Sequence, residues 1–432
     1  MRIAIAGFGI EGHSNYSYFS ALENNEITIV DERPAEKLEN LPEGAQLLTG
    51  EGVFNKLNNF DLVVRTAGLS PHKIRTNGKI WSATNEFFSK CPAPIIGVTG
   101  SKGKGTTASL ISEILKAAGH KVWLVGNIGL PALDVLAEIK PSDIVVYELS
   151  SFQLWDIEYS PQVAVVLYIE QEHLDVHTSM EDYVAAKANI TARQKPNEHI
   201  IYNSNNSYSS KIAASSPAVS IAYPSESAAH IKNDSFYYGK MLICPLKALK
   251  IIGAHNQQNA LAAIDAAWQF TQNTAAIFAG LNNFKGLPHR LAFVAEKNGV
   301  RYYDDSIATT PSSAIAALRS FPAETPKVII LGGSFKGSDF TELALELTKH
   351  QVQAILIGDE AERLKQACDA AGFKNYEILQ NTKAEEFTNC AASLAQPGSV
   401  VLLSPAAASF GLFKNYAHRG EAFISAVNNL EG

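Results

Sequence analysis

The sequence has little cysteine, no excess of basic residues and no long apolar run. Its four cysteines, Cys91, Cys244, Cys368 and Cys390, are far apart. They therefore form no metal-type pair, and a disulfide framework is not expected in so long a chain. We expect reduced thiols and a cytoplasmic protein. The formal net charge of -7 gives no reason to expect nucleic acid or an anionic membrane surface as a partner.

The lack of long apolar runs argues against membrane insertion, because a transmembrane helix needs roughly 20 consecutive apolar residues. The N-terminal segment is apolar after Arg2, but glycines and a glutamate soon interrupt it. This pattern predicts a first strand and not a signal peptide. Hydrophobic residues still make up 46% of the 432 residues. Such a chain can form more than one core, and its length indicates two to four domains of roughly 150 residues.

What the sequence does contain is an alternation of short apolar runs and longer helix-like segments. Ten runs are RIAIAG, EITIVDE, DLVVRTAG, PIIGVTG, KVWLVGN, DIVVYELS, VAVVLYI, KVIILGG, QAILIGD and SVVLLSP. Continuous runs are typical of strands buried on both faces of a parallel sheet, and several end in a turn before a helix. We therefore predict an α/β fold. Residues 203–234 have the weakest pattern, and we expect short surface strands and loops there.

Three glycine-rich turns each follow a predicted strand and precede a predicted helix: GFGIEG, GVTGSKGKG and LGGSFKG. Three such turns predict three separate sheets rather than one long sheet. We place the first domain at residues 1–88, the second at 89–287 and the third at 288–432.

The first turn, GFGIEG, spans Gly7 to Gly12, and Asp31 ends the next predicted strand. This matches the dinucleotide-binding pattern, in which a downstream acid bonds a ribose. The same glycines suit any tight turn that brings backbone amides near a phosphate. An NAD site, a nucleotide-diphosphate site and a purely structural turn all remain open.

The second turn contains Gly100, Gly103 and Lys104 and is shorter than the standard phosphate loop. Its glycines allow backbone N–H groups to face a phosphate, and the lysine supplies a positive charge. Gly105 stands where phosphate loops usually carry a hydroxyl for Mg²⁺, although hydroxyl residues follow at Thr106, Thr107 and Ser109. We predict a phosphate site here rather than a glycine-rich turn with solvated lysines.

Metal ligands are expected near strand ends if the chemistry is phosphoryl transfer. Glu148 ends the run DIVVYE, and a carboxylate after so apolar a strand is costly to bury unpaired. His173 and Asp175 follow the next run. These three residues form a candidate Mg²⁺ cluster, although histidine is an unusual Mg²⁺ ligand and each residue alone fits a structural role.

Two further segments carry polar residues beside predicted helices or strands. His255, Asn256 and Asn259 lie at the start of an amphipathic helix, where amides either cap the helix or read a base edge, and capping is the simpler interpretation. Lys336 and Ser409 each follow an apolar run in the third block. They suit an anionic small substrate, and surface polar residues are the alternative.

Taken together, these segments resemble the Mur ligases. GVTGSKGKGTT, GNIGLPAL, YELSSFQL, EHLDVH, DYVAAK, GAHNQQNAL, GLPHR, DDSIAT and SPAAAS with FKNYAHRG occur in the order found in that family. The resemblance covers the whole chain. It implies a Rossmann-like N-terminal domain, a central ATPase domain of the phosphate-loop type and a Rossmann-like C-terminal domain. The final pattern favours the members that add D-glutamate.

The resemblance also implies where the substrates bind. The UDP group of the substrate would contact Gly9, Ile10, Glu11, Asp31, Arg33, Thr66, Ala67 and Gly68. ATP would contact Gly100, Ser101, Lys102, Gly103, Lys104, Gly105, Thr106, Asn256, Asn259, Arg290 and Asp305. Thr309, Ser409 and Tyr416 would hold the substrates in the third domain. No nicotinamide is then needed.

The residues that the resemblance places at the reacting groups are Lys104, Asn127, His173, Lys187 and Lys336. Mg²⁺, in one or two copies, would be held by Thr106, Glu148, His173 and Lys187. Lys187 matches a lysine that the family carries as a carbamate, a carboxylate-like ligand. From the residues alone it is an exposed helical lysine.

The expected reaction joins D-glutamate to UDP-N-acetylmuramoyl-L-alanine with ATP, through an acyl phosphate, in peptidoglycan precursor synthesis. The protein is expected to act as a monomer. Related ligases with another amino acid, such as L-glutamate, or another nucleotide substrate are the first alternative. An NAD-dependent oxidoreductase built on GFGIEG leaves the Lys104 loop unexplained, and a binding protein with an inactive ATP site is motivated by Gly105.

The sequence departs from the family pattern at Lys102, Gly105, Glu172, Ile307 and Glu11. Ile307 replaces a lysine that is usual in the D-glutamate members, so contact with phosphate or with the incoming amino acid is in doubt. Glu11 places an anion in the diphosphate turn, which is unfavourable unless it points to solvent. We expect Thr106, or a water beside Gly105, to make the missing metal contact.

Overall fold

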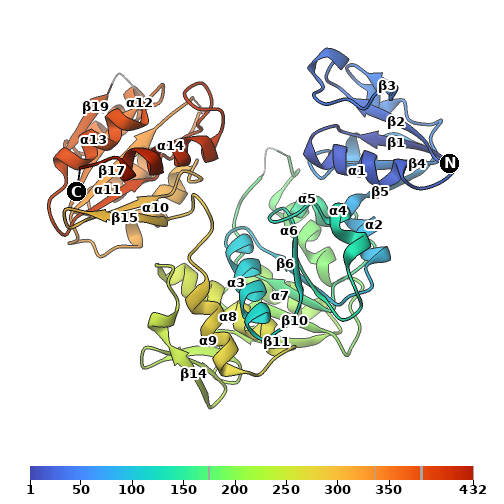
Figure 1. Ribbon diagram of the computed structural model, residues 1–432, viewed down its shortest axis with the longest axis horizontal. Helices are drawn as coiled ribbons and strands as arrows, with labels where there is room; N and C mark the ends of the chain where they lie inside the picture. The colour runs from blue at the N-terminus through green and yellow to red at the C-terminus, as the bar shows by residue number, and fades with distance from the viewer. Residues whose placement is uncertain (174–175, 336, 380–382, 432) are drawn as a thin grey trace. The chain divides into compact units, whose positions relative to one another are not determined.

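The structure is a computed structural model that describes residues 1–173, 176–335, 337–379 and 383–431. It forms two compact units: unit 1 contains residues 1–249 and 255–284, and unit 2 contains residues 250–254 and 285–432 (Figure 1). Within the described ranges, no helix combines the length and the apolar character needed to cross a bilayer.

Unit 1 begins with a parallel sheet whose strand order is β3-β2-β1-β4-β5. Its strands are β1 (Arg2–Ala6), β2 (Glu26–Asp31), β3 (Gln46–Thr49), β4 (Leu62–Arg65) and β5 (Lys79–Ser82). The helices are α1 (Ile10–Ser20) and α2 (Ala83–Lys90), with short 3-10 turns η1 (Ala35–Lys37), η2 (Val53–Asn55) and η3 (Pro71–Lys73). The strand order reverses between β1 and β4, and ligands of open α/β sheets bind at such a point.

The second sheet of unit 1 is also parallel, in the order β11-β10-β9-β6-β8-β7. Its strands are β6 (Ile95–Thr99), β7 (Val122–Gly126), β8 (Ile144–Glu148), β9 (Val163–Val166), β10 (His199–Asn203) and β11 (Val219–Tyr223). The helices between them are α3 (Lys104–Ala117), α4 (Ala132–Val135), η4 (Leu136–Glu138), α5 (Ser151–Leu154), α6 (Met180–Ala188), η5 (Asn189–Thr191) and α7 (Ser207–Ser215). Strand β6 lies between β8 and β9, so the loop after β6 is flanked by the ends of both.

Unit 1 ends with a small antiparallel sheet of β12 (Ala229–Lys232), β13 (Ser235–Tyr238) and β14 (Met241–Pro245). It is followed by η6 (Leu246–Ala248), α8 (Ala254–Trp268) and α9 (Thr274–Asn283). Helix α9 packs on α3, and Gly280 permits this, since a Cβ there would lie 2.5 Å from the Ile114 Cα.

Unit 2 contains a sheet in the order β15-β16-β20-β17-β18-β19, in which only β15 and β16 pair antiparallel. Its strands are β15 (Ala292–Lys297), β16 (Val300–Asp304), β17 (Lys327–Gly332), β18 (Val352–Ile357), β19 (Tyr376–Leu379) and β20 (Val400–Leu403). The helices are α10 (Pro311–Arg319), α11 (Thr341–Leu347), α12 (Ala361–Ala370), α13 (Ala384–Leu394) and α14 (Tyr416–Asn428). Separate apolar clusters pack on its two faces, one with Leu331 and Leu356 and one with Ile330 and Ile355.

The predicted α/β class is confirmed, and each of the ten apolar runs forms a strand. The prediction for residues 203–234 is wrong in part, because α7 lies there. Asn206 caps this helix by accepting a hydrogen bond from the Ser209 N–H, and Ile212 packs in the core. The boundaries of the three predicted domains stay predictions.

Candidate active site

The turn between β6 and α3 places two glycines in conformations that other residues rarely adopt. Gly100 has φ +151° and Gly103 has φ +85°. A Cβ on Gly103 would lie 2.3 Å from Asn259 Oδ1, so the turn lies directly against α8. Asn259 in turn donates to Asn256 Oδ1 at 3.1 Å, and both side chains are buried. The two asparagines therefore lie beside the glycine-rich turn, and their predicted contact with ATP stays a prediction.

Two lysines converge on one carbonyl of this turn. Lys104 Nζ donates to Gly100 O at 3.0 Å and to Ser101 O at 2.8 Å, and Lys187 Nζ donates to Gly100 O at 2.8 Å. Lys187 is 1% exposed. Burial and then the charge of Lys104 hold the pKa of Lys187 well below its usual value, while Glu172 and Glu148 oppose that shift. The pattern of residues alone indicated that Lys187 is an exposed helical lysine. The structure shows that this interpretation is wrong, because the side chain is buried.

Ser101 ties the turn to the segment after β9. Its Oγ donates to Glu170 O and accepts from Glu170 N, both at 2.9 Å, and lies 2.9 Å from the Tyr183 hydroxyl. The Tyr183 hydroxyl also donates to Glu172 Oε2 at 3.4 Å. Lys102 lies 3.8 Å from Glu172, so the unusual lysine has an acidic neighbour.

Glu148 stands at the end of β8, next to the turn, and is 5% exposed. Asn127 Nδ2 donates to its Oε1 at 3.3 Å, and the Asn127 N–H donates to its main-chain carbonyl at 3.2 Å. In the part of the chain that the structure describes, no three His, Cys, Asp or Glu side chains are grouped to hold a metal ion. A cation near Glu148 therefore needs a further oxygen ligand, and Mg²⁺ takes oxygen ligands.

His173 and His177 lie on the segment after β9. His173 has φ +58°, and its ring lies 5.0 Å from the ring of Phe152. His177 Nε2 lies 3.0 Å from Ser151 Oγ, and its Nδ1 lies 3.3 Å from Asp182 Oδ2. Burial lowers the pKa of His177 although Asp182 opposes the shift, which favours a neutral imidazole. Asp175 lies outside the described residues.

The turn after β1 meets the turn after β4 at the reversal point of the first sheet. A Cβ on Gly7 (φ +92°) would lie 2.3 Å from Thr66 Oγ1. The Ala67 N–H donates to Glu11 Oε2 at 2.7 Å. Glu11 is half-buried and bonded to this turn, so it does not simply point to solvent, the one condition under which the sequence allowed an anion here. Burial raises its pKa, while the Ala67 amide and the charge of Arg65 oppose the rise.

Asp31 ends β2 beside these turns. It accepts hydrogen bonds from the Phe8 N–H at 2.8 Å and from the Arg33 N–H and Nε at 2.9 and 3.0 Å. Burial raises the pKa of Asp31, but the bonds from Arg33 and Phe8 outweigh it and hold the pKa below its ordinary value. Gly9, Ile10 and Gly68 are exposed. The structure thus brings together most of the residues predicted to contact UDP.

In unit 2, Asp305 follows β16 and is 6% exposed. It accepts from Ser404 Oγ at 2.6 Å and from the Leu291 N–H at 3.0 Å. Burial raises the pKa of Asp305 to about 7, and these bonds and the charge of Arg290 oppose the rise. The Thr309 N–H donates to Ile307 O at 2.8 Å, in the turn that leads to α10.

Ser409 is buried in the segment after β20, beside the end of β17. The Ser334 N–H donates to Ala408 O at 2.9 Å, which joins the two segments. Tyr416 begins α14, is 40% exposed, and its carbonyl accepts from Ser306 Oγ at 2.7 Å. Lys336 lies outside the described residues, so its role stays a prediction.

Sequence reasoning missed two buried arginines. Arg65 ends β4 and makes contacts with α5, and Arg419 of α14 donates to the carbonyls of Ser306, Ala407 and Ala408. A signal was present for Arg65, because a charge that ends a strand as apolar as DLVV must find a partner if it is buried. Nothing in the sequence identified its partner, Asp156.

Comparisons with known proteins agree on one family. Residues 98–267 match the Mur ligase middle domain, and residues 289–407 match the Mur ligase glutamate ligase domain. The chain is 36% identical over 449 residues to the UDP-N-acetylmuramoylalanine--D-glutamate ligase of Clostridium tetani. This alignment covers 99% of this chain and 97% of that protein. A protein of the same name from Symbiobacterium thermophilum is 35% identical over 450 residues, covering 99% and 98%.

Solved structures of other ligases are similar in fold. The UDP-N-acetylmuramate-alanine ligase MurC of Thermotoga maritima matches with a TM-score of 0.61 and 18% identity over 99% of both chains. The MurF ligase of Thermotoga maritima, solved in complex with ADP, matches with a TM-score of 0.59 and 20% identity over 98% of this chain and 93% of that chain.

Proposed function

Because the chain belongs to the Mur ligase family, we propose that it joins D-glutamate to UDP-N-acetylmuramoyl-L-alanine in an ATP-dependent reaction of peptidoglycan precursor synthesis. Full-length relatives at 36% and 35% identity carry the name of this ligase. The observation that carries the proposal at the residue level is that Lys104 and Lys187 both bond the Gly100 carbonyl of the turn after β6, with the Glu148 carboxylate near enough for its charge to act on Lys187.

ATP is the nucleotide that we assign to this turn. The left-handed φ of Gly103 and its close contact with Asn259 form a turn that no larger side chain fits. Lys104 bonds two carbonyls of the turn, and exchanging them for phosphate oxygens would place its charge on the transferred group. The N-terminus of α3 adds a favourable dipole.

The reaction we propose begins with attack of the substrate carboxylate on the γ-phosphate of ATP, which gives an acyl phosphate and ADP. The amine of D-glutamate then attacks the activated carbonyl, phosphate leaves, and the new amide remains. The contribution of the protein is to hold the reactants in place and to offset negative charge. Lys104 does this at the phosphates, and Asn127 orients the Glu148 carboxylate.

Mg²⁺ would neutralise charge on the phosphates when bound. Glu148 is a buried carboxylate of the type this ion takes, and we assign Thr106, His173 and Lys187 as its other ligands. Burial and the charge of Lys104 hold the pKa of Lys187 well below its ordinary value, which favours the neutral amine, and a neutral amine is the form that reacts with CO₂ to give a carbamate. A carbamate would supply the further oxygen ligand that the site needs beside Glu148.

We assign the amino acid to unit 2, with Ser409, Tyr416, Thr309 and Lys336 as contacts and Arg290 and Asp305 at the nucleotide. The alternative is a related ligase that takes another amino acid, such as L-glutamate, which Ile307 in place of a lysine motivates. We further propose a monomer in the cytoplasm, where the four free cysteines stay reduced.

The test is phosphate release by the purified protein with ATP, Mg²⁺ and UDP-N-acetylmuramoyl-L-alanine. Release should depend on D-glutamate and should be absent without an amino acid. Greater stimulation by L-glutamate would favour the alternative, and no stimulation of folded protein by either isomer would reject both. Mass spectrometry of the intact protein in bicarbonate should show added CO₂ in the wild type but not in Lys187→Met.

A further inference from the structure

Arg65 is a buried cation that bonds groups from both parallel-sheet regions of unit 1. It is fully buried. Its Nε donates to Asp156 Oδ2 at 2.8 Å, and its Nη2 donates to Phe152 O at 2.8 Å and to Asp156 Oδ1. Its Nη1 donates to Leu69 O at 3.2 Å and to Thr66 O at 3.3 Å. These bonds match the five donors of a guanidinium.

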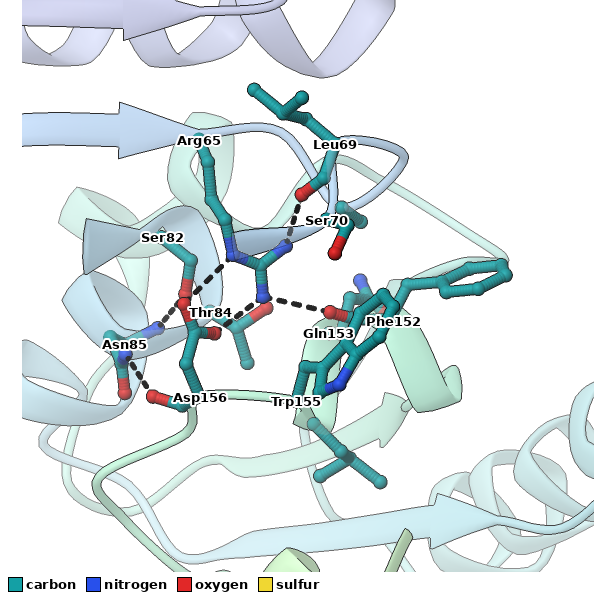
Figure 2. Close-up of polar contacts among 12 residues, drawn as sticks. Arg65, Leu69, Ser70, Ser82, Thr84, Asn85, Phe152, Gln153, Trp155 and Asp156 are labelled. Atoms are coloured by element: carbon teal, nitrogen blue, oxygen red, sulfur yellow. Dashed lines mark hydrogen bonds and ion pairs between the residues drawn. The ribbon is translucent and has the colours of Figure 1, made fainter. Parts of the chain in front are cut away.

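The bonded groups belong to two different parts of unit 1. Thr66 and Leu69 form the turn after β4, and Phe152 and Asp156 belong to α5 and the residues that follow it. Figure 2 shows the guanidinium of Arg65 between the Leu69 carbonyl and the Asp156 carboxylate. A planar group with fixed donor directions sets the distance and the angle between these segments.

Asn85 of α2 holds the same segment from a second side. Its Nδ2 donates to Asp156 O at 3.0 Å (Figure 2). Its Oδ1 accepts from the Glu158 N–H at 2.8 Å. Ser82 caps the helix that carries Asn85. Residues 156–158 are therefore tied to both the end of β4 and the start of α2.

The segment that Arg65 bonds, residues 152–156, is close in the chain to the candidate active site. Helix α5 begins at Ser151, three residues after Glu148, the last residue of β8, and Ser150 caps it. Ser151 Oγ contacts His177, and the ring of Phe152 lies 5.0 Å from that of His173. In the chain, Arg65 is followed by Thr66 and Ala67. The Ala67 N–H donates to Glu11 Oε2.

We propose that Arg65 is a positioning residue, which through Asp156 and Phe152 holds the turn at 66–69 at a fixed distance from the Glu148 end of β8. This rests on the proposed function, in which the turn at 66–69 lies at the UDP site and the Glu148 end of β8 lies at the ATP site. Arg65 touches neither reactant in this scheme. It keeps the carboxylate of one bound substrate aligned with the γ-phosphate of the other.

The physical argument is that the reaction joins ligands held by two sheets. A misplacement of the order of 1 Å between reacting atoms costs of the order of 10²-fold in rate. Truncating Arg65 leaves Asp156 without its cation and the carbonyls of Leu69 and Phe152 without their donor. The two segments then lose their common partner, while each nucleotide keeps its own contacts.

The experiment compares Arg65→Met, Arg65→Lys and Asp156→Asn with the wild type. Lys79→Met is the matched control, because Lys79 and Glu158 form a 3.0 Å ion pair between the same parts of the chain but are about half exposed. Phosphate release gives kcat, and equilibrium binding gives the Kd of UDP and of a non-hydrolysable ATP analogue, each alone. Thermal unfolding shows which variants are folded.

For Arg65→Met we expect kcat to fall by roughly 10–100-fold with each Kd within about twofold of the wild type. Arg65→Lys should recover part of kcat, and Lys79→Met should keep it. An unchanged kcat, or a loss explained by the Kd of one nucleotide, would overturn the proposal. If Arg65→Met does not fold, the decision passes to Arg65→Lys and Asp156→Asn, and wild-type kcat in both overturns it.

Hydrogen exchange separates this proposal from the proposed function. In folded variants at Arg65, residues 66–69 and 152–156 should lose protection together, even if the wild type shows no ligase reaction. Loss of protection at 66–69 alone, or at neither segment, would contradict the coupling that Arg65 is proposed to provide.

Discussion

Gly103 and Asn259 touch so closely that a Cβ on Gly103 would lie 2.3 Å from the Asn259 side-chain oxygen. One residue belongs to the turn after β6 and the other to α8, more than 150 positions later in the chain. The φ of +85° at Gly103 is a second reason for glycine here. The close contact and the left-handed backbone both require glycine at position 103, where the turn packs against Asn259.

The substitution Gly103→Ala should therefore lower stability by about 1–3 kcal/mol and weaken ATP binding. Gly119→Ala is the matched control, because Gly119 also has a left-handed φ (+92°) but no atom lies within 4 Å of its Cβ position. It should cost stability and leave ATP affinity unchanged. Isothermal titration with an ATP analogue and urea unfolding measure the two effects, and equal ATP affinities in both variants would contradict the expectation.

Glu11 should weaken binding of the UDP substrate. Its carboxylate occupies the Ala67 N–H, and it places a negative charge in the turn assigned to a diphosphate. Glu11→Ser should lower the KM for this substrate several-fold, and Glu11→Gln, which keeps an acceptor without the charge, should have a smaller effect. The pKa of Glu11 is raised by burial, so the wild-type KM should rise as the pH rises through that pKa while the KM of both variants stays level.

The fold was largely predictable because parallel strands buried on both faces leave a local signal. Runs such as VAVVLYI and KVIILGG consist of apolar residues whichever way the side chains point. Two of the strands that escaped prediction, β3 and β19, lie at sheet edges. β3 (Gln46–Thr49) and β19 (Tyr376–Leu379) contain half-exposed and polar residues, and pairing with β2 and β18 rather than composition makes them strands.

The candidate site divides in the same way. The glycine-rich turns around Gly7 and Gly103 could be predicted as candidate sites, because the backbone conformation there requires glycine. Lys187 and Arg65 could not be recognised as buried from the residues alone, because a charged residue is usually exposed. Their burial depends on partners distant in sequence, Gly100 for Lys187 and Asp156 for Arg65. The family resemblance supplied Lys187, and only the structure revealed Arg65.

Arg419 should hold in place the segments of unit 2 that we propose to contact the amino acid. It is 1% exposed and donates to three carbonyls and to Ser306 Oγ. Arg419→Met leaves these buried acceptors unpaired, which should lower the stability of unit 2 by about 3–5 kcal/mol. Arg319→Met removes a 61% exposed side chain and leaves Lys349 and His350 beside its partner Glu346, so it should cost less stability than Arg419→Met. Urea unfolding compares them, and equal losses would contradict this role.

Asp265 should make the stability of unit 1 depend on pH. Its side chain is 0% exposed and its Oδ1 accepts from the Ala229 N–H at 2.8 Å. Burial raises the pKa of Asp265 to about 8, against the opposing bond from Ala229. The folded protein therefore keeps a proton that the unfolded chain loses near its ordinary pKa. This contribution is fully present at acid pH and is lost as the pH rises toward about 8.

Asp265→Asn removes the titrating group and keeps an oxygen for the Ala229 N–H. The free energy of unfolding of the variant minus that of the wild type should increase with pH by at most about 1.4 kcal/mol per unit between about pH 4 and pH 8. It should level off above that range, because the carboxyl is then ionised in both states of the wild type. Urea unfolding at pH 5, 6, 7 and 9 measures the difference. Other titrating groups cancel in it, so parallel curves would mean that Asp265 is already ionised in the folded protein at pH 5.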